Sequence, residues 1–146
     1  MRRKNLRLGW DEGSTAVEAA ITLSLLSTLI FGIFDFGMAL WQWNTMQTAV
    51  LHAGRYAMVN NSYPTNPPGC AGSLLSCTEA QMQAVLTSAS ISCPLPSSPA
   101  AGSSYVCATQ NAGTPPTMSL SASYGYSIFG FAGPFNVAAQ STVPLD

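Results

Sequence analysis

The chain has 146 residues, only 8% of which are charged, and four of its five basic residues lie within the first seven positions. After Gly13 there are four acidic residues and one arginine, so four minus one gives a net charge of -3. These residues are Glu18, Asp35, Glu79, Asp146 and Arg55. Such a surface does not attract nucleic acid, and the length beyond the first 40 residues suffices for one small domain and no large catalytic architecture.

Residues 1–13 form a basic and polar leader that is too short to fold by itself, and we expect it to be cleaved. An alternative is signal-peptidase release after Ala39, because Gly37, Met38 and Ala39 are small or apolar. The apolar run before Ala39 is longer than the core of an ordinary signal peptide, however, and helical periodicity continues beyond it. We therefore favour retention of the helix.

Residues 14–40 are predicted to be the transmembrane half of a long helix that covers residues 15–59. The segment 16–40 reaches the ~20 mostly apolar residues needed to cross ~30 Å of hydrocarbon. Because basic residues that flank a membrane span stay in the cytoplasm, the N-terminus is expected inside and the rest of the chain outside.

Residues 41–59 are predicted to continue the helix as an amphipathic spine for an outer domain. Apolar or small residues recur at steps of three and four, namely Leu40, Trp43, Met46, Val50, Gly54, Ala57 and Met58. Trp41 and Trp43 suit an interfacial aromatic belt, and packing of Trp43 on the domain is an open alternative. Residues 60–64 should end the helix, because Asn and the residue before Pro64 oppose its continuation.

Residues 60–146 are predicted to be a small disulfide-bonded head. After a loop over residues 64–76, Thr78 and Gln81 form a capping-box pattern at the start of a short helix. Strand candidates are residues 90–93, 104–109, 117–128 and 135–143, with an aromatic connector over 129–135. The strand at 117–128 alternates apolar and small polar residues most clearly. We expect an α+β fold in which a small antiparallel sheet packs on the long helix.

All four cysteines, Cys70, Cys77, Cys93 and Cys107, fall in the predicted head, which would face an oxidising compartment. The intervals between neighbours are 6, 15 and 13 residues, whereas structural zinc sites use tight pairs, so we expect disulfides and no metal. Three pairings are formally possible. We favour Cys70 with Cys77 and Cys93 with Cys107, because each closes a short local loop.

The residues offer little for catalysis. His52 is the single histidine and has no obvious partner, and no nucleophile elbow or phosphate-binding loop is present. We therefore predict no catalytic, cofactor or metal site.

The two acids in the apolar helix call for an explanation, because a carboxylate near the bilayer centre costs about 2.5 to 3.5 kcal/mol. If the bond after Gly13 were cut, Glu18 would be positioned to pair with the new amine of Ser14. The alternative is that Glu18 reaches the cytoplasmic interface by itself. Asp35 lies about 25 Å further along the axis. Solvation at the outer interface accounts for it, and pairing across a helix interface is the alternative.

The pattern of Gly13 followed five residues later by Glu18 and an apolar helix resembles the processing site of type IV pilin-like proteins. Three further stretches look like the N-terminal signature of the TadE-like minor pilins of the Flp (Tad) pilus system. These stretches are AVEAA (residues 16–20), FGIFDFG (31–37) and AGRYA (53–57). The resemblance covers roughly residues 9–58.

The resemblance implies a pilin-like protein that a prepilin peptidase cuts between Gly13 and Ser14. It implies that Glu18 recruits or aligns subunits, with other pilin-like subunits, the pilus assembly platform and the membrane as partners. The protein would sit in the bacterial inner membrane, and could be assembled into an extracellular pilus.

Two rival hypotheses belong to other functional classes. A membrane-tethered binding module would stay unprocessed and would capture ligands through an exposed patch of head aromatics, namely Phe129, Phe131, Phe135, Tyr124 and Tyr126. A secreted small enzyme released at Ala39 would begin near Leu40 and would need a catalytic cluster that the sequence does not offer.

Overall fold

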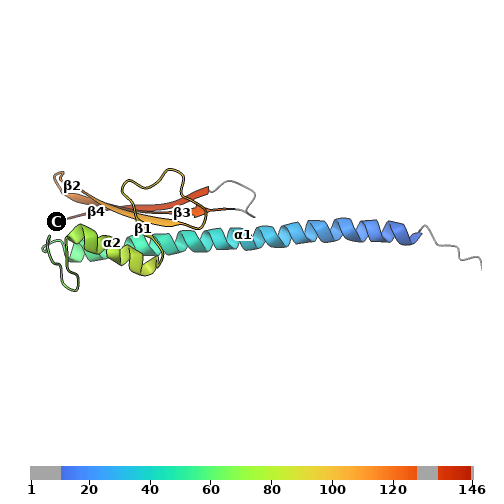
Figure 1. The fold of residues 1–146 in the computed structure, drawn as a ribbon, viewed down its shortest axis with the longest axis horizontal. Coiled ribbons are helices and arrows are strands. Elements are labelled where there is room, and N and C mark those ends of the chain that lie inside the picture. The colour runs from blue at the N-terminus through green and yellow to red at the C-terminus, as the bar shows by residue number, and fades with distance from the viewer. Residues whose placement is uncertain (1–10, 128–134, 146) are drawn as a thin grey trace, which may run out of the picture. The chain divides into compact units, whose positions relative to one another are not determined.

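The structure is a computed structural model that describes residues 11–127 and 135–145 (Figure 1). Most of the expected leader and nearly all of the aromatic connector at 129–135 lie outside the described residues. The elements in chain order are two helices followed by four strands. This confirms the α+β layout with a long N-terminal helix.

The first helix, α1, runs from Asp11 to Val59 and has 49 residues. It ends where the sequence predicts and begins four residues before the expected start at residue 15. The packing of the chain divides it into two compact units between Phe36 and Gly37. The second unit contains the C-terminal part of α1 and the whole head.

The C-terminal part of α1 packs on the head through small residues. The fully buried positions are Met46, Ala49, Val50, Ala53 and Ala57, which recur at three- and four-residue steps as one helix face. Trp43 and Met58, which the sequence placed on this face, remain 44% and 46% exposed. The buried face is therefore narrower than predicted.

Close approach of the sheet explains this narrow face. A Cβ atom added to Gly54 would meet Val143 Cγ1 at 3.1 Å and Leu120 Cδ1 at 3.4 Å. The absence of a side chain at Gly54 thus lets two strands lie directly on α1.

Asn60 directly follows the last residue of α1, and its backbone N–H and side-chain amide both donate to the carbonyl oxygen of Tyr56 at 3.0 Å. A chain turn that contains Pro64 then leads to the second helix, α2 (Leu74–Val85). The polar residue at the turn and the following proline end the helix as expected.

The start of α2 corrects the predicted capping box at Thr78 and Gln81. The N-cap is Ser73, whose Oγ accepts from the backbone N–H of Ser76 at 3.2 Å. Thr78 is buried inside the helix and donates its hydroxyl to the carbonyl oxygen of Leu74 at 2.7 Å. Ser73 is as good a cap as Thr78 by residue type, so local chemistry did not distinguish them.

The sheet contains β1 (Ser90–Ile91), β2 (Ser104–Asn111), β3 (Thr117–Tyr126) and β4 (Phe135–Pro144) in that spatial order. Strands β2, β3 and β4 are antiparallel, but β1 pairs parallel to β2. The sheet is therefore mixed, and the expectation of a purely antiparallel sheet was wrong. The proline-rich segment after β1 carries the chain back to the end of the sheet at which β1 began. Strand β2 therefore runs parallel to β1, whereas a tight hairpin would have made the two strands antiparallel.

The core lies between the sheet, α1 and α2. The larger buried residues come from every layer: Met46 and Val50 from α1, Leu74 and Met82 from α2, and Val106, Met118 and Leu120 from the strands. Alternation along β3 places Met118, Leu120 and Ala122 inward, as its period-2 pattern predicted.

Candidate functional site

The predicted processing site lies in the first turns of α1. Gly13 and Ser14 are helical and exposed in the structure. Apart from the adjacent residues and the backbone of the helix itself, no atom of the described residues lies within 4 Å of a Cβ added to Gly13. Substitution of Gly13 by alanine therefore creates no clash, so that an effect of this substitution on cleavage would not come from a distorted helix.

The N-terminal part of α1 presents apolar side chains around its whole circumference. Val17, Ile21, Leu25 and Phe34 are 61%, 62%, 69% and 71% exposed. A helix that is apolar on all sides is stable in lipid or against other proteins, but not in water. Among the described residues, the helix Gly13–Val59 is long and apolar enough to cross a membrane.

Three hydroxyl groups within this apolar stretch are satisfied by the helix itself. Thr22 Oγ1 donates to the backbone carbonyl of Glu18, Ser24 Oγ to that of Ile21, and Thr28 Oγ1 to that of Ser24, at 2.8 to 3.0 Å. Such bonds let serine and threonine enter a medium without water. The carboxylates of Glu18 and Asp35 are then the costly groups of the segment.

Glu18 is exposed and Asp35 is half-buried. The 17 helical steps between them correspond to about 25 Å along the axis, whereas the hydrocarbon core of a bilayer is ~30 Å thick. A straight span that places Asp35 at the outer interface therefore leaves Glu18 several ångströms inside the hydrocarbon. In such a span Glu18 would be the more costly of the two carboxylates.

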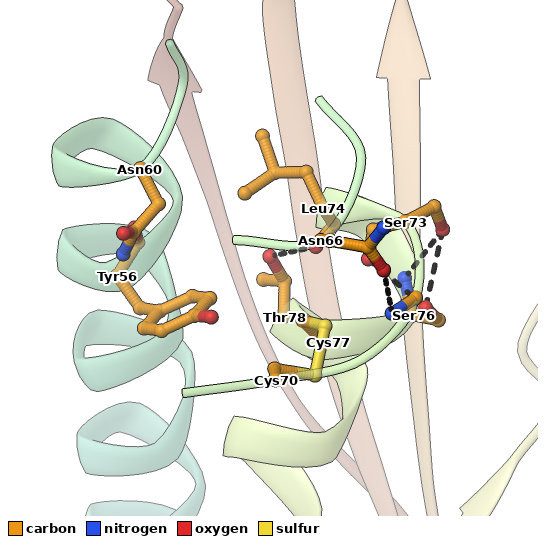
Figure 2. Close-up of a disulfide and its surroundings, with 10 residues drawn as sticks. Tyr56, Asn60, Asn66, Cys70, Ser73, Leu74, Ser76, Cys77 and Thr78 are labelled. Atoms are coloured by element: carbon orange, nitrogen blue, oxygen red, sulfur yellow. Dashed lines mark hydrogen bonds between the residues drawn. A yellow bond between two sulfur atoms is a disulfide. The ribbon is translucent and has the colours of Figure 1, made fainter. Parts of the chain in front are cut away.

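The head contains two disulfides, Cys70–Cys77 and Cys93–Cys107, with Cα atoms 6.0 and 5.2 Å apart. These are the pairs that the sequence favoured among the three possibilities. Figure 2 shows the first bridge beside Thr78, with the ring of Tyr56 projecting from α1 toward it. This bridge ties the loop before α2 to the first turn of the helix.

The second disulfide adjoins a buried carboxylate that sequence reasoning missed. Glu79 of α2 is 6% exposed. Its Oε1 accepts from the backbone N–H of Ala108 at 3.2 Å and lies 3.6 Å from Cys93 Sγ. A signal was present in the sequence, because residues 60–146 contain only Glu79 and Asp146 as charged residues.

Glu79 completes the edge of the sheet. Strand β1 has only two residues, and after it the N–H of Ser92 still donates to the carbonyl of Val106 at 3.0 Å. The next β2 group that points to this side is the N–H of Ala108, which Glu79 binds. One turn later in α2, Gln83 Nε2 donates to the carbonyl of Ala89 at 2.7 Å and holds the start of β1. These contacts are structural.

No group of three or more His, Cys, Asp or Glu side chains in the described part of the chain is arranged to hold a metal ion. His52 is exposed on α1. The chemically distinctive feature of the molecule is thus its uncovered apolar helix with two acids.

A family profile described as TadE-like protein matches residues 13–60. The match covers the apolar helix, both acids and the small-residue face that packs on the head, and it nearly coincides with the range 9–58 inferred from the motifs. No curated protein and no solved structure matches the chain. Residues 13–60 are thus a TadE-like segment, which confirms the family resemblance.

Proposed function

We propose that the protein is a structural, non-enzymatic minor pilin or pseudopilin that takes part in the assembly of a Tad/Flp-type pilus. It would act at initiation, at the tip or in the assembly platform. It would sit in the bacterial inner membrane with its N-terminus in the cytoplasm and its head outside. The observation that carries this proposal is the apolar, uncovered helix within a TadE-like segment.

The mechanism is lateral exchange of the helix between lipid and other helices. Its exposed Val, Ile, Leu and Phe side chains are as well solvated by lipid tails as by apolar helices, so transfer between the two involves little change in hydrophobic free energy. Packing and polar pairing then decide where the helix resides. This makes other pilin-like subunits and the assembly platform the expected partners.

Glu18 supplies the polar pairing in this proposal. Cleavage between Gly13 and Ser14 by a prepilin peptidase would create an amine one helical turn before Glu18. A carboxylate inside the hydrocarbon is costly, and an opposite charge on the same or a neighbouring helix offsets that cost. The pair would favour assembled subunits over isolated ones when the amine comes from a neighbour.

The first experiment is N-terminal sequencing of the protein extracted from membranes of cells with and without a prepilin peptidase. We expect the mature protein to begin at Ser14 in cells that have the peptidase, and not in cells that lack it. Gly13→Ala should block cleavage, whereas Gly32→Ala should not. The two glycines are matched, because both have open space at the Cβ position.

The sequencing result also separates the rival functions. A mature protein that retains Met1 favours a membrane-tethered binding module, and a start near Leu40 favours a secreted protein. Either result in a strain with an active peptidase would overturn the pilin proposal.

The second experiment addresses Glu18. Glu18→Ala should leave membrane insertion and cleavage intact but remove the protein from purified pilus or platform assemblies. Thr22→Val, one turn further on, is the control, because the Thr22 hydroxyl bonds only to its own helix in the described structure. Normal incorporation of Glu18→Ala as the only copy contradicts the pairing role.

A further inference from the structure

A cavity of about 260 Å³ opens in the head between α1, the end of α2 and the sheet. Trp41 and Gln42 contribute from α1, Thr87 and Ser88 follow α2, and Ser104 and Tyr124 come from β2 and β3. Segments that are distant in sequence thus converge on one hollow, which lies entirely within the second compact unit.

The cavity carries no charge. None of the residues that line it is Asp, Glu, Lys, Arg or His. A phosphate, carboxylate or ammonium ligand would therefore lose its hydration without gaining an opposite charge, which is unfavourable. The lining excludes ionic ligands on this ground.

The cavity nevertheless offers unused hydrogen-bonding groups. In the part of the chain that the structure describes, the side chains of Gln42, Thr87, Ser88, Ser104 and Tyr124 make no hydrogen bond to other protein groups. Amides and hydroxyls both donate and accept. An apolar ligand would cover these groups and leave them without partners, which is also costly.

Two aromatic rings complete the lining. Trp41 is 59% exposed, and Tyr124 is partly buried with its hydroxyl available. Aromatic rings combine a large apolar face with a polar edge, and a sugar ring likewise combines an apolar C–H face with hydroxyl groups. We propose that this cavity binds an uncharged sugar unit of a glycan, stacked on an aromatic ring and hydrogen-bonded by the amide and hydroxyl groups. This proposal does not depend on the role of the protein in a pilus.

The test uses the full chain in lauryldimethylamine oxide, because maltoside and glucoside detergents carry sugars that would compete. Saturation-transfer NMR with glucose, galactose, mannose and N-acetylglucosamine should show transfer to at least one of them. Calorimetry then measures its Kd. Absence of transfer to all four sugars, or tighter binding of glucuronate than of glucose, overturns the proposal.

Variants locate the binding. Trp41→Ala should raise the Kd about tenfold or more. Tyr124→Phe, which removes one hydroxyl and keeps the ring, should raise it about fivefold. Trp43→Ala is the matched control, because this neighbouring tryptophan is 44% exposed and does not line the cavity. The Kd of this variant for the sugar should stay within about twofold of that of the unsubstituted protein. Equal Kd values for Trp41→Ala and Trp43→Ala refute the site.

Discussion

Replacement of Glu79 tests how the edge of the head sheet is held. Glu79→Ala removes the acceptor of the Ala108 N–H at a site where the glutamate is only 6% exposed. A buried donor left without a partner costs about 1 to 3 kcal/mol. Lost packing of the side chain adds to this cost, so we expect a loss of about 2 to 4 kcal/mol in the free energy of unfolding.

Glu79→Gln is the matched control, because the amide keeps a carbonyl oxygen at nearly the same place. It loses the stronger bond of a charged acceptor, which is worth roughly 1 kcal/mol more than a neutral one. The two variants should therefore differ by at least about 1 kcal/mol, with Glu79→Ala the less stable. For a head of this size, 1 kcal/mol corresponds to roughly 4 °C in Tm.

Two measurements on the full chain in detergent check this expectation. Near-ultraviolet circular dichroism reports the thermal unfolding of the head. Amide hydrogen exchange reports the Ala108 N–H itself, which should exchange much faster in Glu79→Ala than in Glu79→Gln. If the two variants have equal Tm values and equally slow exchange at Ala108, the reasoning is wrong, and the 3.2 Å contact does not stabilise the sheet edge.

Four further substitutions test packing within the second compact unit; three should lower stability and the fourth should not. Gly125→Ala should prevent native packing of the loop on β3 and lower Tm sharply, because the added Cβ would overlap the carbonyl oxygen of Ala100. Gly102→Ala is the comparison and should cost about 1 kcal/mol of stability, because space for a Cβ is open there but φ is +78°. Gly54→Leu should destabilise the head by about 3 kcal/mol or more through overpacking against Val143. Tyr56→Phe should leave thermal stability unchanged or slightly raise it, because its buried hydroxyl has no hydrogen-bond partner among the described residues; a large loss would contradict this.

Features that depend on short-range periodicity were predictable from sequence. The apolar run in α1 and the alternation in β3 repeat at the spacing of the helix and of the strand, so each pattern reports its own element. The TadE-like motifs were also recognisable from sequence, because each is a short run of neighbouring residues within α1. Glu18 and Asp35 stood out because a charge in an apolar helix is costly wherever the rest of the chain lies.

Features that depend on contacts between distant segments were decided only by the tertiary structure. The two residues of β1 carry no mark of their parallel direction, which depends on where the following loop returns the chain. Ser73 caps α2, whereas Thr78 is buried within the helix, although both residue types are suitable caps.

The sequence by itself thus determined an apolar helix with two acids and TadE-like motifs, and a cysteine-containing head with only two charged residues. Only the tertiary structure placed Glu79 against Ala108 and brought Trp41, Ser104 and Tyr124 around one cavity. The physical reason is that helix and strand patterns arise from neighbours in the chain, whereas buried hydrogen bonds and cavities arise from residues that meet only when the chain has packed.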